Sequence, residues 1–346
     1  MAKAASPAAA GGPVQASCPN PTEVQGFMTC ADVDKARQEG SVVYYSPDVE
    51  THMVAYLQAF NDLFPEIKVD KYLREQTGRL YTKLTSERQA GQYVADVLSL
   101  SDYAPALDFV SKNGYSSYIS PESVQFRPEF RSNPPGMFTW YNIVIAGIAV
   151  NSSATPPDEA PKNWPDLLEP KWKGGINFKD SASGLQFVQW YMLRQLYGDQ
   201  YWKDMAGQNP RGLASTVQQY ERLVNREDKI NGLAQYSTFL ENKAKGAPLE
   251  FIAPPDGLPV TPLMIGVVDK APHPEAAKLF VDFMLSKKGQ ETIIKQSFSH
   301  GPREDVAPPE GGKPITELKL LIPDWTEIVK SSDQFKTEWN NLTGLQ

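Results

Sequence analysis

The chain has 346 residues, of which 41% are hydrophobic, so it is long enough to form two domains with substantial cores. Its formal charge of −7 at pH 7 argues against binding to nucleic acid or to an anionic membrane surface, both of which attract basic proteins. The longest purely apolar run, 143–150, is far shorter than the roughly 20 residues of a membrane-spanning helix, so no direct membrane insertion is expected.

The first 17 residues are rich in Ala, Ser, Pro and Gly, a composition typical of a disordered tail. They contain no apolar stretch of the kind found in signal peptides. One explanation is a chain that begins just past a removed signal peptide, and the alternative is a cytoplasmic protein with a flexible tail. We predict that 1–30 form a disordered or loosely attached segment.

The two cysteines, Cys18 and Cys30, lie twelve positions apart, which is too wide for a CxxC redox or metal motif. Three interpretations are open at this point. The cysteines form a disulfide that closes a small loop, they are two free thiols, or Cys18 carries a lipid anchor.

From residue 40 to 112, short β-branched or aromatic runs alternate with amphipathic helices. This alternation predicts a parallel α/β sheet. The predicted strands are 40–46, 67–73 and 95–100, and the predicted helices are one that ends at Pro65 and two at 78–89 and 105–112.

The middle of the chain contains a long apolar strand, a Pro-rich stretch at 151–170 and several further elements. The predicted strands are 138–150, one within 171–180, 249–253 and 260–268. The predicted helices include a short one that opens at Asn163, one after Gly184, 200–207, 216–227, one after a turn at 232–236, and one that begins at Pro274.

The run from Lys243 to Glu291, KAKGAPLEFIAPPDGLPVTPLMIGVVDKAPHPEAAKLFVDFMLSKKGQE, resembles the hallmark segment of bacterial extracellular solute-binding proteins. These are the capture subunits of ABC importers, in the branch that includes ferric-ion, phosphonate, sugar-phosphate and polyamine binders. A weaker resemblance extends from about Ser41 to Asp305.

The resemblance implies an α/β protein with the two-lobed type II periplasmic-binding-protein fold, in which two crossover strands form a hinge. Lobe 1 is then 31–142 plus 264–346, and lobe 2 is 143–263. It also implies a periplasmic monomer without a cofactor, which closes on a small-molecule ligand and delivers it to a membrane permease. Export to an oxidising compartment agrees with a disulfide between Cys18 and Cys30.

Ligands of open α/β sheets bind beyond the carboxyl ends of the strands, so the loops that follow the strands are the candidate site. The Ser181–Gly184 turn opens a helix and suits an anion, although such a turn is equally typical of an ordinary N-cap. Arg74 or Arg79 is a candidate for balancing the charge of an anion. The predicted ligand-binding residues are Tyr45, Ser46, Thr77, Ser101, Tyr141, Ser181, Ser183, Gly184, Gln235 and Tyr236.

The main functional interpretation is capture of a small anionic or zwitterionic organic solute. The alternative is a ferric-ion site that uses Tyr236 and Tyr141, with Tyr45 or His52, because ferric-binding relatives carry adjacent tyrosines at the place of Tyr236. Here the next residue is Ser237, so the pair is interrupted. A third interpretation is a secreted α/β enzyme that uses Asp48, Asp102 or Asp180. The sequence lacks the nucleophile-elbow, P-loop and dinucleotide motifs, so we predict a binding protein rather than an enzyme.

Overall fold

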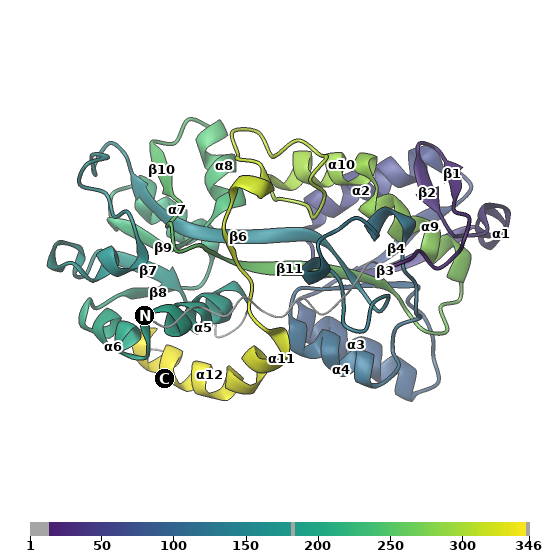
Figure 1. Ribbon diagram of the computed structural model, residues 1–346, viewed down its shortest axis with the longest axis horizontal. Coiled ribbons are helices and arrows are strands. Elements are labelled where there is room, and N and C mark those ends of the chain that lie inside the picture. The colour runs from purple at the N-terminus through teal and green to yellow at the C-terminus, as the bar shows by residue number, and fades with distance from the viewer. Residues whose placement is uncertain (1–13, 181–183, 344–346) are drawn as a thin grey trace.

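The computed structural model describes residues 14–180 and 184–343 and consists of two α/β lobes joined by two long strands (Figure 1). These strands, β6 (Thr139–Asn151) and β11 (Leu258–Val267), are almost entirely buried and pair antiparallel through the middle of the molecule. The predicted α/β fold with two crossover strands is therefore confirmed.

The strands predicted for 40–100 begin and end within two residues of the observed positions, and those predicted within 171–180 and at 249–253 are also present. The strands at 211–213, 230–235 and 320–321 were not predicted. Within the described residues the sheet contains eight strands besides β6 and β11. They are β3 (Ser41–Ser46), β4 (Lys68–Arg74), β5 (Val97–Leu100), β7 (Ile176–Lys179), β8 (Arg211–Leu213), β9 (Ile230–Gln235), β10 (Leu249–Ile252) and β12 (Leu320–Leu321). The sheet runs β4-β3-β5-β11-β6-β9-β7-β8, with β10 paired to β6 and β12 to β11. β3 is parallel to β4 and β5, as the alternating pattern predicts.

Helices cover both sides of this sheet; in Figure 1, α2, α8 and α10 lie on one side and α3, α4, α5 and α12 on the other. The helices are α1 (Val33–Glu39), α2 (Glu50–Leu63), α3 (Thr77–Gln89), α4 (Tyr103–Ser111), α5 (Leu185–Tyr197), α6 (Gln200–Gly207), α7 (Thr216–Val224), α8 (Tyr236–Ala244), α9 (Pro274–Leu285), α10 (Lys287–Ser297), α11 (Trp325–Ile328) and α12 (Ser332–Thr343). Within 14–180 and 184–343, no helix combines the length and the hydropathy needed to cross a bilayer.

The turn predicted at 232–236 is wrong, because these residues belong largely to β9, a buried strand between β6 and β7. Gly232 lies under the ring of Phe178, and a Cβ atom at this position would approach that ring to 2.5 Å. The glycine therefore serves close packing inside the sheet, and its presence does not mark a turn.

The C-terminal residues do not belong to lobe 1 alone, as the prediction for 264–346 assumed. Trp325 stacks on Tyr103 of the first lobe with ring centroids 4.2 Å apart. By contrast, Phe335 and Trp339 of α12 are fully buried in the core of the second lobe, where Trp339 packs against Trp202. The chain thus crosses between the lobes a third time, in the yellow segment of Figure 1.

The prediction that 1–30 are loosely attached is also wrong for 14–30, and residues 1–13 lie outside the described part of the chain. β1 (Thr22–Val24) and β2 (Phe27–Thr29) form a hairpin. Phe27 is buried against Phe283, with ring centroids 6.2 Å apart. The Thr29 hydroxyl donates to the buried carboxylate of Asp282 at 2.6 Å, so the hairpin is part of the first lobe's core.

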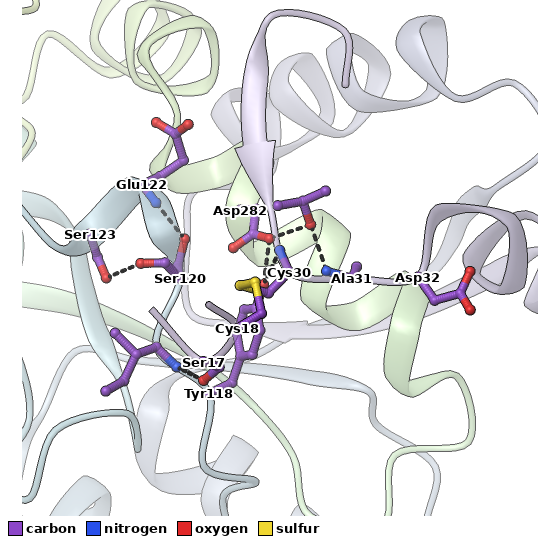
Figure 2. The surroundings of a disulfide bond; sticks show 12 residues. Ser17, Cys18, Cys30, Ala31, Asp32, Tyr118, Ser120, Glu122, Ser123 and Asp282 are labelled. Carbon is purple, nitrogen blue, oxygen red and sulfur yellow. Dashed lines mark hydrogen bonds between the residues drawn. A yellow bond between two sulfur atoms is a disulfide. The ribbon is translucent and has the colours of Figure 1, made fainter. Parts of the chain in front are cut away.

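Cys18 and Cys30 form the predicted disulfide, which joins this hairpin to the preceding segment (Figure 2). The backbone N–H of Cys30 donates to the hydroxyl of Tyr118 at 3.3 Å. Ser17 accepts a hydrogen bond from the N–H of Ile119 through its hydroxyl at 2.7 Å. Both ends of the disulfide loop are thereby held on the same surface segment.

We expect the unreduced protein to contain no titratable thiol and the reduced, denatured protein to contain two. Replacing both cysteines by Ser should lower the free energy of unfolding by up to about 3 kcal/mol, because the unfolded chain loses a loop constraint. Urea unfolding of the double variant beside the oxidised wild type measures this difference. Two free thiols in the unreduced folded protein would contradict the bond.

Candidate ligand-binding site

A cavity of about 270 Å³, here called the polar cavity, lies between the lobes beside the hinge strands β6 and β11. It is bounded by the start of α2, by β6 and β11, by the start of α8 and by α10. Its polar lining includes Asp48, His52, Ser101, Asn142, Gln235, Ser237, Thr238 and Glu241.

Asn142 is a polar side chain of β6 at the cavity and is only 5% exposed. Its Oδ1 atom has no hydrogen-bond partner among the described residues. A buried acceptor without a donor is costly, and such atoms are rare in folded proteins. A ligand that donates a hydrogen bond at this position would satisfy the atom.

Asp48, in the loop between β3 and α2, presents a half-buried carboxylate to the cavity. The hydroxyl of Tyr141 donates to this carboxylate at 2.7 Å, and the hydroxyl of Tyr56 donates to the same oxygen. The Ser46 hydroxyl accepts from the Asp48 N–H at 3.2 Å and so orients the loop. Burial raises the pKa of Asp48, whereas the tyrosine hydrogen bonds and the nearby Arg74 oppose this rise.

The N-termini of two helices also face the polar cavity. α8 begins at Tyr236, its N-cap Gln235 makes no side-chain capping bond, and Ser237 and Thr238 line the cavity. Val49, the N-cap of α2, likewise makes no capping bond and lines the same cavity. Unpaired N–H groups and the positive end of the helix dipole favour an oxyanion here.

Several predicted site residues lie at this cavity or directly behind it. Ser101 and Gln235 line it. Thr77 lies behind Ser101, because its hydroxyl hydrogen-bonds the Ser101 hydroxyl at 2.8 Å and accepts from the Ser101 N–H at 3.2 Å. Ser46 and Tyr141 act through Asp48, as described above. Ser181 and Ser183 lie outside the described residues.

Tyr45 does not reach the cavity, which corrects the prediction for this residue. Its hydroxyl donates to the carboxylate of Glu87 on α3 at 3.0 Å. The neighbouring Tyr44 points the other way, sharing a 2.6 Å hydrogen bond with Ser99 and lying 3.5 Å from the hydroxyl of Tyr141. Strand alternation predicts that only one of the two tyrosines faces the cleft, but not which one.

Tyr236 is likewise packed away from the cavity, although its sequence neighbours line it. Its ring is 5% exposed and stacks on Phe251 at 4.4 Å and on His300 at 5.6 Å. Its hydroxyl accepts from the N–H of Lys313 at 3.2 Å. Tyr141 is engaged with Asp48, so the two tyrosines of the ferric alternative have separate surroundings. In the described part of the chain, no cluster of three or more His, Cys, Asp or Glu is arranged to hold a metal.

A second cavity of about 210 Å³, here called the aromatic cavity, adjoins the first, and Ser101 lines both. The predicted site residue Gly184 lies here, at the start of α5. Its backbone N–H hydrogen-bonds the Asp102 carboxylate across the lobes. Burial raises the pKa of Asp102, and this hydrogen bond opposes the rise. The two lobes therefore touch at the start of α5.

Asn142, Thr238 and Glu241 were not predicted to lie at the site, and Asp48 was predicted only as part of a candidate loop and as a catalytic residue of the enzyme alternative. A signal for Asn142 was present, because it is the lone amide in the apolar run 138–150. A polar side chain in the middle of a buried crossover strand requires a partner. For Thr238 and Glu241 no comparable signal exists, since polar residues are ordinary on an amphipathic helix.

The two lobes, the strands β6 and β11 that join them and the cavity between them form the two-lobed fold of the periplasmic binding proteins. The chain belongs to the family of bacterial extracellular solute-binding proteins, which it matches over residues 94–331. An uncharacterized protein of Haemophilus influenzae is 26% identical over 278 residues, covering 76% of this chain and 78% of the relative. A Salmonella typhimurium periplasmic protein named for binding 2-aminoethylphosphonate is 23% identical over 201 residues, covering 53% and 59%.

Solved structures show the same fold. Iron-bound HitA from Pseudomonas aeruginosa superposes with a TM-score of 0.75 at 22% identity, covering 87% of this chain and 99% of HitA. AfuA from Actinobacillus pleuropneumoniae, with exogenous fructose-6-phosphate bound, gives 0.73 at 24% identity, covering 89% and 99%. The family and these neighbours are binding proteins rather than enzymes.

Proposed function

We propose that this protein is the periplasmic solute-capturing component of an ABC importer and that its ligand is a small zwitterionic organic solute held in the polar cavity. Family membership and the named ligands of the relatives, an aminophosphonate and a sugar phosphate, support capture of a small organic solute. Closure of the lobes about β6 and β11 would present the loaded form to the membrane permease.

The observation that supports a zwitterionic ligand is that Asn142 Oδ1, an acceptor without a partner among the described residues, lines the same cavity as the carboxylates of Asp48 and Glu241. Three acceptors in one cavity call for a ligand that brings donors, as an ammonium group does. The opposite end of the ligand would meet the starts of α2 and α8, which favour an oxyanion. No Lys or Arg among the described residues lines this cavity, so a purely anionic ligand would lack a counter-charge there.

Glu241→Gln is expected to weaken binding of 2-aminoethylphosphonate by about 10-fold or more, because the neutral amide loses a charge-assisted hydrogen bond to the ammonium group. Binding of ethylphosphonate, which lacks the amine, should change little. Isothermal titration of both probes against wild type and variant measures this difference. The exposed pair between Glu241 and Lys245 contributes little to stability.

The matched control is Glu250→Gln, which removes an exposed carboxylate on β10 outside the cavity. This change should leave the affinities for both probes unchanged. Equal losses for the two probes would argue against an ammonium at Glu241. If the purified protein is coloured, binds one ferric ion and binds neither probe, its ligand is iron and the proposal of an organic solute is wrong.

A further inference from the structure

The aromatic cavity differs in chemistry from the polar cavity beside it. Its walls are largely apolar, with the rings of Tyr103, Phe187 and Trp325 and the aliphatic side chains of Val188 and Ile328. Tyr103 and Trp325 are stacked, with centroids 4.2 Å apart and planes inclined by 3°. This stack covers one face of each ring, and the remaining aromatic and aliphatic surfaces of the cavity favour an apolar occupant.

Thr261 of β11 places a hydroxyl among these apolar side chains. The residue is 7% exposed, and its Oγ1 has no hydrogen-bond partner among the described residues. It pairs across the hinge with Val144, next to the pair of Leu263 with Asn142. Among the described residues, the polar cavity therefore contains one buried polar atom without a partner, Asn142 Oδ1, and the aromatic cavity contains two, Thr261 Oγ1 and Trp325 Nε1. The atoms of Asn142 and Thr261 lie on the hinge strands β6 and β11.

The charged groups of the aromatic cavity are already engaged or exposed to solvent. Asp102 accepts from the N–H of Gly184, and the half-exposed Lys336 lies 3.6 Å from Asp333. A charged ligand group would find little compensation here. An apolar ring with one hydrogen-bonding substituent matches what the cavity offers.

Both lobes contribute walls to the cavity. Trp325 is fixed to the first lobe through Tyr103, whereas α12 is fixed in the second lobe by Trp339. The third crossing therefore covers this side of the cleft, while Ser101 forms the boundary with the polar cavity. A ligand that extends past Ser101 from the polar cavity would enter this space between the lobes.

We propose that the aromatic cavity is a second subsite of the same ligand, occupied by an aromatic ring whose hydroxyl or carbonyl substituent hydrogen-bonds to Thr261. This inference rests on the proposed function, because the ring is attached to the zwitterionic head held in the polar cavity. The solute is then a zwitterion with a polar-substituted aromatic group, and it is larger than the head alone.

Three α-aminophosphonates that share one head test this subsite: the phosphonate analogues of alanine, phenylalanine and tyrosine. In wild-type protein the phenylalanine analogue should bind about 10-fold more tightly than the alanine analogue, through burial and stacking of the ring. The tyrosine analogue should gain about a further 5-fold from the hydrogen bond to Thr261.

Thr261→Val should abolish the gain of the tyrosine analogue over the phenylalanine analogue and leave the other two affinities unchanged. It should also raise the melting temperature of the unliganded protein, because an unsatisfied buried hydroxyl is removed. Trp325→Ala should abolish the gain from the ring. Thr292→Val, on the exposed surface of α10, is the matched control and should alter none of these values.

Equal affinity of all three analogues for the wild type would overturn the subsite and leave the zwitterionic head, and hence the proposed function, standing. If the tyrosine analogue still binds more tightly than the phenylalanine analogue to the Thr261→Val variant, the proposed hydrogen bond to Thr261 is wrong. If none of the three analogues binds and 2-aminoethylphosphonate does not bind either, the proposed zwitterionic ligand of the polar cavity is wrong, and the proposed subsite is wrong with it.

Discussion

Trp339→Ala is expected to lower the free energy of unfolding by about 3–5 kcal/mol, the range for loss of a fully buried Trp. The side chain is 0% exposed and packs edge-on against Phe178 and Trp202, with centroids 5.6 and 5.4 Å away. Its indole N–H donates to the carbonyl of Lys179 at 3.0 Å, so the variant also leaves that acceptor without its partner. Chemical denaturation followed by circular dichroism measures the change.

The control is Lys336→Ala on the same helix, where the side chain is 56% exposed and the change should be within about 0.5 kcal/mol. A loss below 1 kcal/mol for Trp339→Ala would mean that α12 is not part of the second core. The same experiment therefore tests the third crossing between the lobes.

Asp282→Asn is expected to remove a pH dependence of stability that originates at a buried carboxyl close to the disulfide (Figure 2). Asp282 is 0% exposed, and its Oδ2 accepts from Thr29 at 2.6 Å and from Tyr118 at 2.5 Å. Burial raises the pKa of this carboxyl from 3.8 to about 7, against the opposing effect of these hydrogen bonds.

Between pH 4 and 7 the folded protein keeps a proton that the unfolded chain has released, so stability falls as pH rises through this interval. Above pH 7 the loss is complete and amounts to at most about 4 kcal/mol, at 1.36 kcal/mol per pKa unit. Asparagine has no proton to release, so the variant should be the more stable protein at pH 8 and nearly equal to wild type at pH 4.

Urea unfolding of wild type and variant at pH 4.5, 6 and 8 measures the difference. Asp34→Asn is the control, because that side chain is 87% exposed and its replacement should leave the wild-type slope in place. An Asp282→Asn variant that is less stable than wild type at pH 8 would show that the carboxylate is stabilising in its charged form.

Much of the fold was predictable because the spacing of apolar residues along the sequence indicates which segments form strands and which form helices. The alternation of strand and helix from 40 to 112 predicted β3, β4 and β5 and the helices between them, and the apolar run 138–150 predicted the crossover strand β6. The rule that ligands bind beyond the carboxyl ends of strands selected the loops that contain Asp48 and Ser101, and both residues line the polar cavity. Both predictions depend only on contacts between residues that are close in sequence or on general sheet geometry.

The sequence by itself determined the α/β class, the two crossover strands and the family. The tertiary structure alone decided which of Tyr44 and Tyr45 faces Tyr141, that Tyr236 packs against Phe251, and that Trp339 belongs to the second lobe. It alone brought Glu241 to the same cavity as Asp48. The physical reason is that a repeat period fixes which residues share a face, whereas the partner that covers the face comes from a distant part of the chain.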